Sequence, residues 1–120
     1  MDLLHAAVVQ HDLDECQRLL AGGINPNVPL PDGHTLLHLA AKAGALRIAQ
    51  ELCEFGADVH AVTALGNTPL HGAAYTGNKA VLMFLLTQGA DPSVKNRDGK
   101  TPADRATEHG HADIAALLAS

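Results

Sequence analysis

The stretch DGHTLLHLAAKAG occupies residues 32–44, and parts of it recur along the chain. Four sets of identical residues lie 33 positions apart: Gly33, Gly66 and Gly99; Thr35, Thr68 and Thr101; Ala40, Ala73 and Ala106; Gly44, Gly77 and Gly110. A fixed period of this length is typical of a repeat array, in which each copy packs on the next. The chain is therefore expected to be a row of similar units.

The period divides the 120 residues into four copies, of which the outer two are truncated. His5 stands 33 residues before His38, so the N-terminal segment is an earlier copy that lacks the leading loop. We expect a single domain, residues 1–120, whose two end copies act as caps. The expected repeats are repeat 1 (1–31), repeat 2 (32–64), repeat 3 (65–97) and repeat 4 (98–120).

Each copy contains signals for two short helices joined by a turn. In repeat 3, Thr68 can cap a helix that has Pro69 at its first position, and Gly77 supplies the left-handed turn that ends it. Asp2 and His11 take the cap and turn positions in repeat 1, His11 at a conformational cost. The second helix has apolar residues at helical spacing and is expected to stop at a glycine: Ile48, Leu52 and Cys53 precede Gly56, and Val81, Leu85 and Leu86 precede Gly89.

A loop of roughly a dozen residues, with Asp, Asn and Gly at its tip, leads from a second helix to the next copy. Helices of about eight to ten residues are marginal in isolation, because nucleation costs more than so few hydrogen bonds return. Stability must therefore come from packing copy upon copy. Since only 2% of the residues are aromatic, the layers between copies must be built from aliphatic side chains.

Residues 32–44 and the stretch GNTPLHGAA at residues 66–74 resemble the signature of the ankyrin repeat, and the resemblance covers essentially the whole chain. It implies an all-α solenoid of four helix-turn-helix repeats with projecting β-turn fingers. It also implies that His5, His38 and His71 bond the backbone of the adjoining finger and so tie one repeat to the next. In size and layout the chain resembles small stand-alone ankyrin proteins of the myotrophin type.

Departures from the ankyrin pattern fall mainly in the end copies. Repeat 4 has Asp104 in place of the histidine and Arg105 in place of a usually apolar residue, and repeat 1 has Glu15 at an apolar position. We expect these polar groups to face water, as terminal caps require. Gly72 replaces Leu39 inside the first helix of repeat 3, which should cost about 1 kcal/mol of helix propensity against Ala.

Composition excludes several classes of protein. A net charge of −5 and a pI near 5.8 argue against a nucleic-acid binder. No apolar stretch approaches the ~20 residues of a membrane span, and the N-terminus lacks the basic residues of a signal peptide. The two cysteines, Cys16 and Cys53, have no metal or disulfide spacing. We expect a monomer in the cytoplasm or the nucleus, with both thiols buried and unreactive.

Eight histidines invite a metal hypothesis, but their spacing does not support one. His109 and His111 flank a turn, whereas His34 and His60 lie on neighbouring fingers, and neither pair has a second pair beside it to complete the three or four ligands of a zinc site. No nucleophile, phosphate loop or metalloprotease motif is present. The sequence therefore predicts no metal, no cofactor and no enzymatic activity.

One modification site is implied by resemblance alone. Leu52, Asp58, Val59 and His60 are similar to the substrate pattern of the ankyrin-directed asparaginyl hydroxylase, with His60 in place of the usual Asn. Asn27 holds the same place in repeat 1, where the acid is missing. Hydroxylation of His60 is one interpretation, and a polar residue that closes the finger turn is the other.

A partner would be expected on the surface that ankyrin proteins form from finger tips and the exposed side of the first helices, here called the concave surface. Carried over by the period, its residues are His34, Lys42, Ala43, Leu65, Asn67, Tyr75, Thr76, Arg97, Lys100, Glu108 and His109, with Val9 and Gln10 extending the row. Tyr75, the single tyrosine, is the strongest candidate, because interface hot spots favour amphipathic rings. The alternative is a ring that lies on its own helix without a partner.

Charge is uneven along the chain, with eight acids and three bases in residues 1–60 and five of each in residues 61–120. Basic side chains gather near the last finger at Lys95, Arg97, Lys100 and Arg105. They could steer an acidic partner segment or simply be solvated. We expect a protein–protein interaction module that presents a rigid concave surface; the alternative is an idealised scaffold, or a fragment of a larger ankyrin protein, without independent function.

Overall fold

The computed structural model describes residues 3–119, and within them every regular element is a helix. The eight helices are α1 (Leu3–Val9), α2 (Leu13–Ala21), α3 (Leu36–Ala43), α4 (Leu46–Glu54), α5 (Pro69–Thr76), α6 (Lys79–Thr87), α7 (Pro102–Glu108) and α8 (Ala112–Ala119). The predicted all-α class is confirmed. Asp2, which was expected to cap α1, lies outside the described residues.

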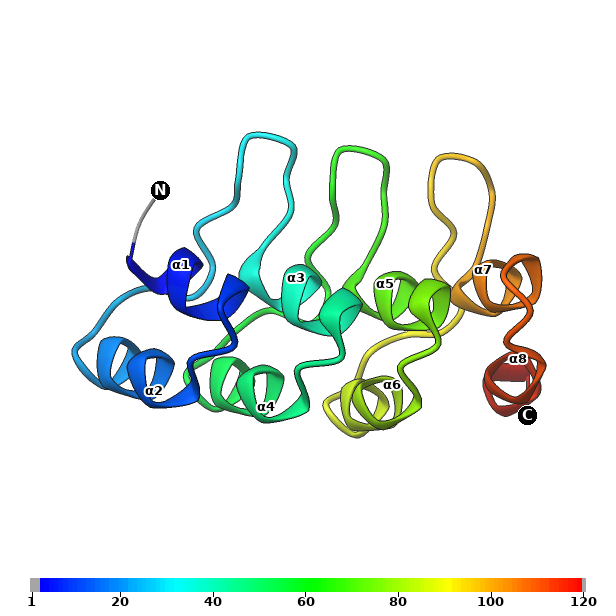
Figure 1. Cartoon of the computed structure of the whole chain (residues 1–120). Helices are drawn as coiled ribbons and strands as arrows, with labels where there is room; N and C mark the ends of the chain where they lie inside the picture. Colours follow the sequence, from blue (N-terminus) through cyan, green and yellow to red (C-terminus); the bar gives the residue numbers. More distant parts are fainter. Residues whose placement is uncertain (1–2, 120) are drawn as a thin grey trace.

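The helices form two layers along an elongated body of 39 × 25 × 22 Å. Figure 1 shows α1, α3, α5 and α7 side by side in one layer, with α2, α4, α6 and α8 in the other. Three long loops project from the side of the first layer as fingers, and α1 and α8 lie at opposite ends of the row (Figure 1). This is the solenoid that the 33-residue period predicts.

The first helices start and stop where the sequence signals indicate. The Oγ1 atom of Thr68 accepts a hydrogen bond from the backbone N–H of His71 at 3.3 Å, and Nδ1 of His71 accepts one from the N–H of Thr68 at 3.1 Å. Thr35 and Thr101 form the same reciprocal cap. Gly77 ends α5 in the left-handed conformation, with φ of 80°. The caps satisfy backbone groups that would otherwise be orphaned at helix ends.

The second helices end slightly earlier than expected. The sequence placed the ends at Gly56 and Gly89, whereas α4 ends at Glu54 and α6 at Thr87. Gly56 instead follows the helix with φ of 93°, and the next N–H, that of Ala57, donates back to the carbonyl of Leu52 at 2.9 Å. This pattern is a Schellman cap, in which the glycine lies just beyond the last helical turn.

The core is a continuous aliphatic band between the two helix layers. Its largest fully buried side chains include Leu37, Leu52, Leu70, Leu82 and Leu85. No phenylalanine belongs to this set, so the expected aliphatic layers are present. Leu70 lies on α5 and Leu82 on α6. The same band therefore joins the two helices of a repeat and neighbouring repeats.

Buried polar contacts link each repeat to the next. His38 Nε2 donates to the carbonyl of Asn67, and His71 Nε2 donates to that of Lys100, both at 2.9 Å, as the ankyrin resemblance implies. A second set was not foreseen. The amide of Asn78 donates to the carbonyl of Lys42 at 3.0 Å. One period later, Nε2 of His111 lies 3.2 Å from the carbonyl oxygen of Tyr75, near the end of α5.

We predict that His11→Gly stabilises the protein by about 0.5–1 kcal/mol. His11 is a non-glycine residue with positive φ, at 56°, and stands where Gly44 ends α3 with φ of 73°. A left-handed conformation crowds the Cβ atom, and glycine removes that cost. Urea unfolding would measure the change. Gln10→Gly, on the neighbouring exposed residue, is the control and should not stabilise; equal effects of the two substitutions would contradict the prediction.

Candidate functional site

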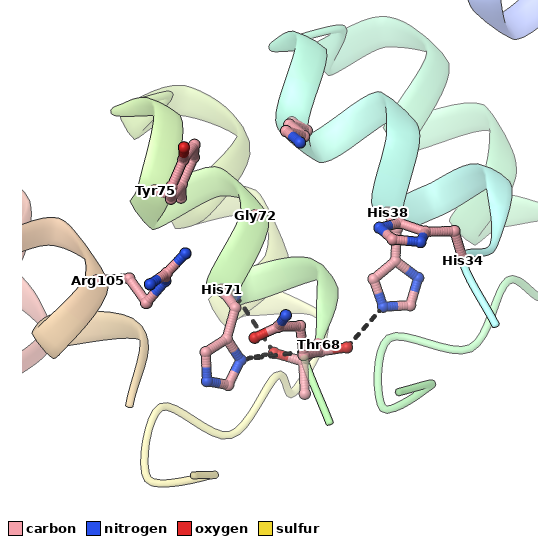
Figure 2. Close-up of a pocket in the computed structure, with 9 residues that line it drawn as sticks. His34, His38, Thr68, His71, Gly72, Tyr75 and Arg105 are labelled. Atoms are coloured by element: carbon pink, nitrogen blue, oxygen red, sulfur yellow. Dashed lines mark hydrogen bonds between the residues drawn. The ribbon is translucent and has the colours of Figure 1, made fainter. Parts of the chain in front are cut away.

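A pocket of about 200 Å³ opens on the concave surface between α3, α5 and α7. His38 and Lys42 come from α3, Gly72 and Tyr75 from α5, and Arg105 from α7, so three successive repeats build it. Figure 2 shows these helices around the opening. A volume near 150 Å³ can hold a benzene molecule, so this pocket has room for one partner side chain.

Gly72 creates the space. It stands in the register of Leu39, and a Cβ atom added there would come no closer than 3.8 Å to the carbonyl oxygen of His38 or to Cβ of Lys42. Such a Cβ atom would be in ordinary van der Waals contact with α3, and Gly72 lines the pocket, so α5 contributes no side chain at this point of the pocket wall. From the sequence, Gly72 was expected to weaken the helix; in the structure it also opens the concave surface.

Tyr75 lies half-buried at the pocket, in contact with basic side chains from both neighbouring repeats. Nζ of Lys42 lies 5.7 Å from the centre of the ring, and Cζ of Arg105 lies 4.9 Å from it. The imidazole of His109 packs against the same ring, with 4.0 Å between ring centres. Cations within about 6 Å of an aromatic ring are attracted to its face. The ring therefore attracts the half-buried Arg105 and, at the limit of this range, the exposed Lys42.

Arg105 corrects one expectation from the sequence. It was expected to face water as part of the end cap, but it is half-buried and lies against Tyr75 (Figure 2). The physical reason is the Tyr75 ring on α5, which attracts the guanidinium to its face at the pocket that Arg105 and Gly72 both line. Its Nη1 atom is 3.5 Å from Oε1 of Glu108, a longer contact than a good hydrogen bond.

The two histidines beneath the pocket are part of its frame. Burial lowers the pKa of both His38 and His71, so the neutral rings are favoured. Both ring nitrogens of His71 are engaged, Nδ1 with Thr68 and Nε2 with the carbonyl of Lys100. His34 lies at the rim, where its Nδ1 is 2.8 Å from Oδ2 of Asp32. These rings shape the pocket and hold its walls together.

The other predicted concave residues are more dispersed. His34, Lys42, Asn67 and Tyr75 line the pocket, whereas Leu65 stands on a finger with 64% of its surface exposed. Asn67 and Thr76 take part in internal bonds, since Asn67 Oδ1 accepts from the amide of Asn96 at 2.8 Å and Thr76 donates to a backbone carbonyl at 3.1 Å. The remaining positions are exposed or partly exposed: Ala43, Arg97, Lys100, Glu108 and His109, with Val9 and Gln10 at the start of the row.

The finger of repeat 2 presents His60 to solvent. Its backbone N–H donates to Oδ1 of Asp58 at 2.8 Å, which closes the turn that the sequence suggested. In repeat 1 the equivalent Asn27 side chain is already bonded to the backbone of Gly56 and Asp58. Hydroxylation of His60 stays a prediction, and its exposed side chain would be accessible to an enzyme.

The cysteines sit among apolar side chains. Cys16 is fully buried and Cys53 is partly buried. Burial raises the pKa of Cys16, and it raises that of Cys53 to about 11. Both thiols therefore stay protonated at neutral pH, which matches the expectation of unreactive cysteines.

Two further features can be stated for residues 3–119. No group of three or more His, Cys, Asp or Glu side chains in this part of the chain could hold a metal ion. None of its helices combines the length and the apolar character that crossing a membrane would demand.

Comparison with known proteins agrees with the fold. A family model described as ankyrin repeats, in three copies, matches residues 4–96 and again residues 63–120. No curated protein matches the chain. The two matches together span nearly all of the described helices, and those helices are paired as ankyrin repeats require. The chain therefore belongs to the ankyrin repeat family.

Proposed function

We propose that the chain is a protein-binding module that presents its concave surface, rigidly, to a partner protein. Ankyrin repeats are in general protein–protein interaction modules and are typically not catalytic. The observation that carries the proposal is the pocket of about 200 Å³ on this surface, lined by side chains from three repeats. The likeness to myotrophin-type proteins is one of size and layout, and it suggests no particular partner.

Rigidity supports this mechanism. Beneath the pocket, His38 and His71 each bond the following finger, and Asn78 bonds the end of α3. A surface that is already ordered loses less conformational entropy when it binds. Leu65 adds exposed apolar area on its finger. The free cysteines fit a reducing compartment, so we place the module in the cytoplasm or the nucleus.

The test is a pull-down from source cytosol with the wild-type chain and with Tyr75→Ala and Lys42→Ala. We expect recovery of a partner to fall about tenfold or more with each variant, as for a hot-spot truncation. Met83→Ala is the matched control, since Met83 is exposed on α6 in the other helix layer. Thermal unfolding must show that all variants are folded. Recovery that is unchanged by Tyr75→Ala and Lys42→Ala would place the interface elsewhere.

A further inference from the structure

We infer that the pocket between α3, α5 and α7 binds the carboxylate of an Asp or Glu side chain in an acidic segment of the partner. This inference rests on the proposed function, because it names the chemistry that the concave surface recognises. It starts from the shape of the site. Gly72 adds no side chain to the pocket wall, and an opening of about 200 Å³ admits a single side chain.

Charge selects the kind of side chain. Lys42 and Arg105 line the pocket from opposite sides of α5, and none of its described lining residues is an Asp or Glu. Two carboxylates contact lining residues without lining the pocket themselves: Glu108 forms an ion pair with Nη1 of Arg105 at 3.5 Å, and Asp32 lies beside His34. Two cations around a space that lacks a lining carboxylate are complementary to an anionic group.

Both cations lie within reach of one aromatic ring, and the half-buried Arg105 is the closer of the two. Both lie against the ring of Tyr75, Lys42 with Nζ at 5.7 Å and Arg105 with Cζ at 4.9 Å from its centre. A guanidinium carries five N–H donors, and the single long contact with Glu108 leaves most of them available. An arginine that is already oriented can bind a carboxylate through two parallel hydrogen bonds.

The surroundings favour an acidic segment over an isolated acidic residue. The acidic half of the chain is residues 1–60, whereas residues 61–120 have equal numbers of acids and bases. On the finger next to α7, Lys95, Arg97 and Lys100 outnumber the two acids, Asp91 and Asp98. Basic side chains beyond the pocket would attract further acidic residues of the same segment and speed its association.

The test begins with selection of peptides from a displayed random library on the immobilised wild-type chain. The probe is the best selected peptide, compared with a version in which its acidic residue is changed from Glu to Gln or from Asp to Asn. We expect about a tenfold weaker affinity for the amide peptide, by fluorescence anisotropy at low salt. The double variant Lys42→Gln/Arg105→Gln should bind the acidic and the amide peptide with equal affinity. Combining the change in the protein with the change in the peptide gives a double-mutant cycle that isolates the interaction between the two cations and the carboxylate.

Two further variants locate the carboxylate. Gly72→Leu restores the side chain found at Leu39 and should close the pocket, so selectivity for the acidic peptide should be lost; Gly72→Ala provides a smaller obstruction if the leucine variant unfolds. Arg47→Gln/Lys79→Gln is the control, because it makes the same charge change on α4 and α6 in the other layer. Selectivity should survive in this control.

Each outcome decides the matter. Acid selectivity that disappears in the pocket variants and persists in the control supports the inference. Peptides that bind the concave surface without an acidic preference, or with one unaffected by the pocket variants, overturn the inference and leave the proposed function intact. Failure to select any acidic peptide overturns the inference alone; if Tyr75→Ala also leaves partner recovery unchanged, the proposed function is overturned as well.

Discussion

Replacing Leu85 with alanine should lower the free energy of unfolding by about 2–5 kcal/mol. Leu85 lies on α6 with none of its surface exposed, in the aliphatic band that joins the repeats. The substitution removes buried methyl groups and leaves a cavity that the surrounding helices can fill only in part. Because each helix in residues 3–119 has only seven to nine residues, these helices depend on packing for their stability.

Urea unfolding followed by circular dichroism measures the effect. We expect a single cooperative transition for the wild-type chain and a lower midpoint for Leu85→Ala, with cooperativity reduced where the central layer has opened. Met83→Ala, on the same helix but 47% exposed, should change stability by less than about 0.5 kcal/mol. Similar losses in the two variants would show that the apolar band is not what joins the repeats.

The sequence predicted the fold well because the ankyrin period places equivalent residues in equivalent surroundings. Thr68 and His71 form their cap, and His71 reaches the next finger, just as the repeated motif indicates. His11 adopts the strained turn that its place in the period implies. Each of these roles is set within one repeat or at one fixed junction, so inspection of a single copy reveals it.

The pocket could not be predicted in the same way, because it depends on differences between copies. Gly72 lacks the side chain that Leu39 has one repeat earlier, and Arg105, at the same position one repeat later, lies over the ring of Tyr75. Asn78 likewise donates to the carbonyls of Ala41 and Lys42 on α3 in the preceding repeat. Ala45, at the same position one repeat earlier, has no polar side chain and cannot form such bonds. The signals available in the sequence were Gly72 and Arg105, which occupy the same position in adjacent copies.

Replacing His71 with leucine should cost about 2–4 kcal/mol, although the two side chains are similar in volume. His71 is 2% exposed, and its ring joins the N–H of Thr68 to the carbonyl of Lys100. Leucine would leave both backbone groups buried without a partner. Asp104→Leu is the matched control, since Asp104 holds the same register but is exposed and accepts only within its own cap. It should cost about 0.5–1 kcal/mol.

The pH dependence separates the titrating ring from its packing. Burial lowers the pKa of His38 and His71 in the folded state, and the charge of Arg105 lowers that of His71 further. The unfolded chain keeps the ordinary pKa of about 6.5, so below this pH it binds more protons than the folded chain. Wild-type stability is therefore full above about pH 7 and falls as the pH drops through 6.5 towards the folded values. Urea unfolding between pH 7.5 and 5 measures this decline in the free energy of unfolding. The decline should be smaller in His71→Leu, which keeps only His38 of the two buried rings, and undiminished in Asp104→Leu. Equal declines in wild type and His71→Leu would mean that the His71 ring does not link folding to protonation.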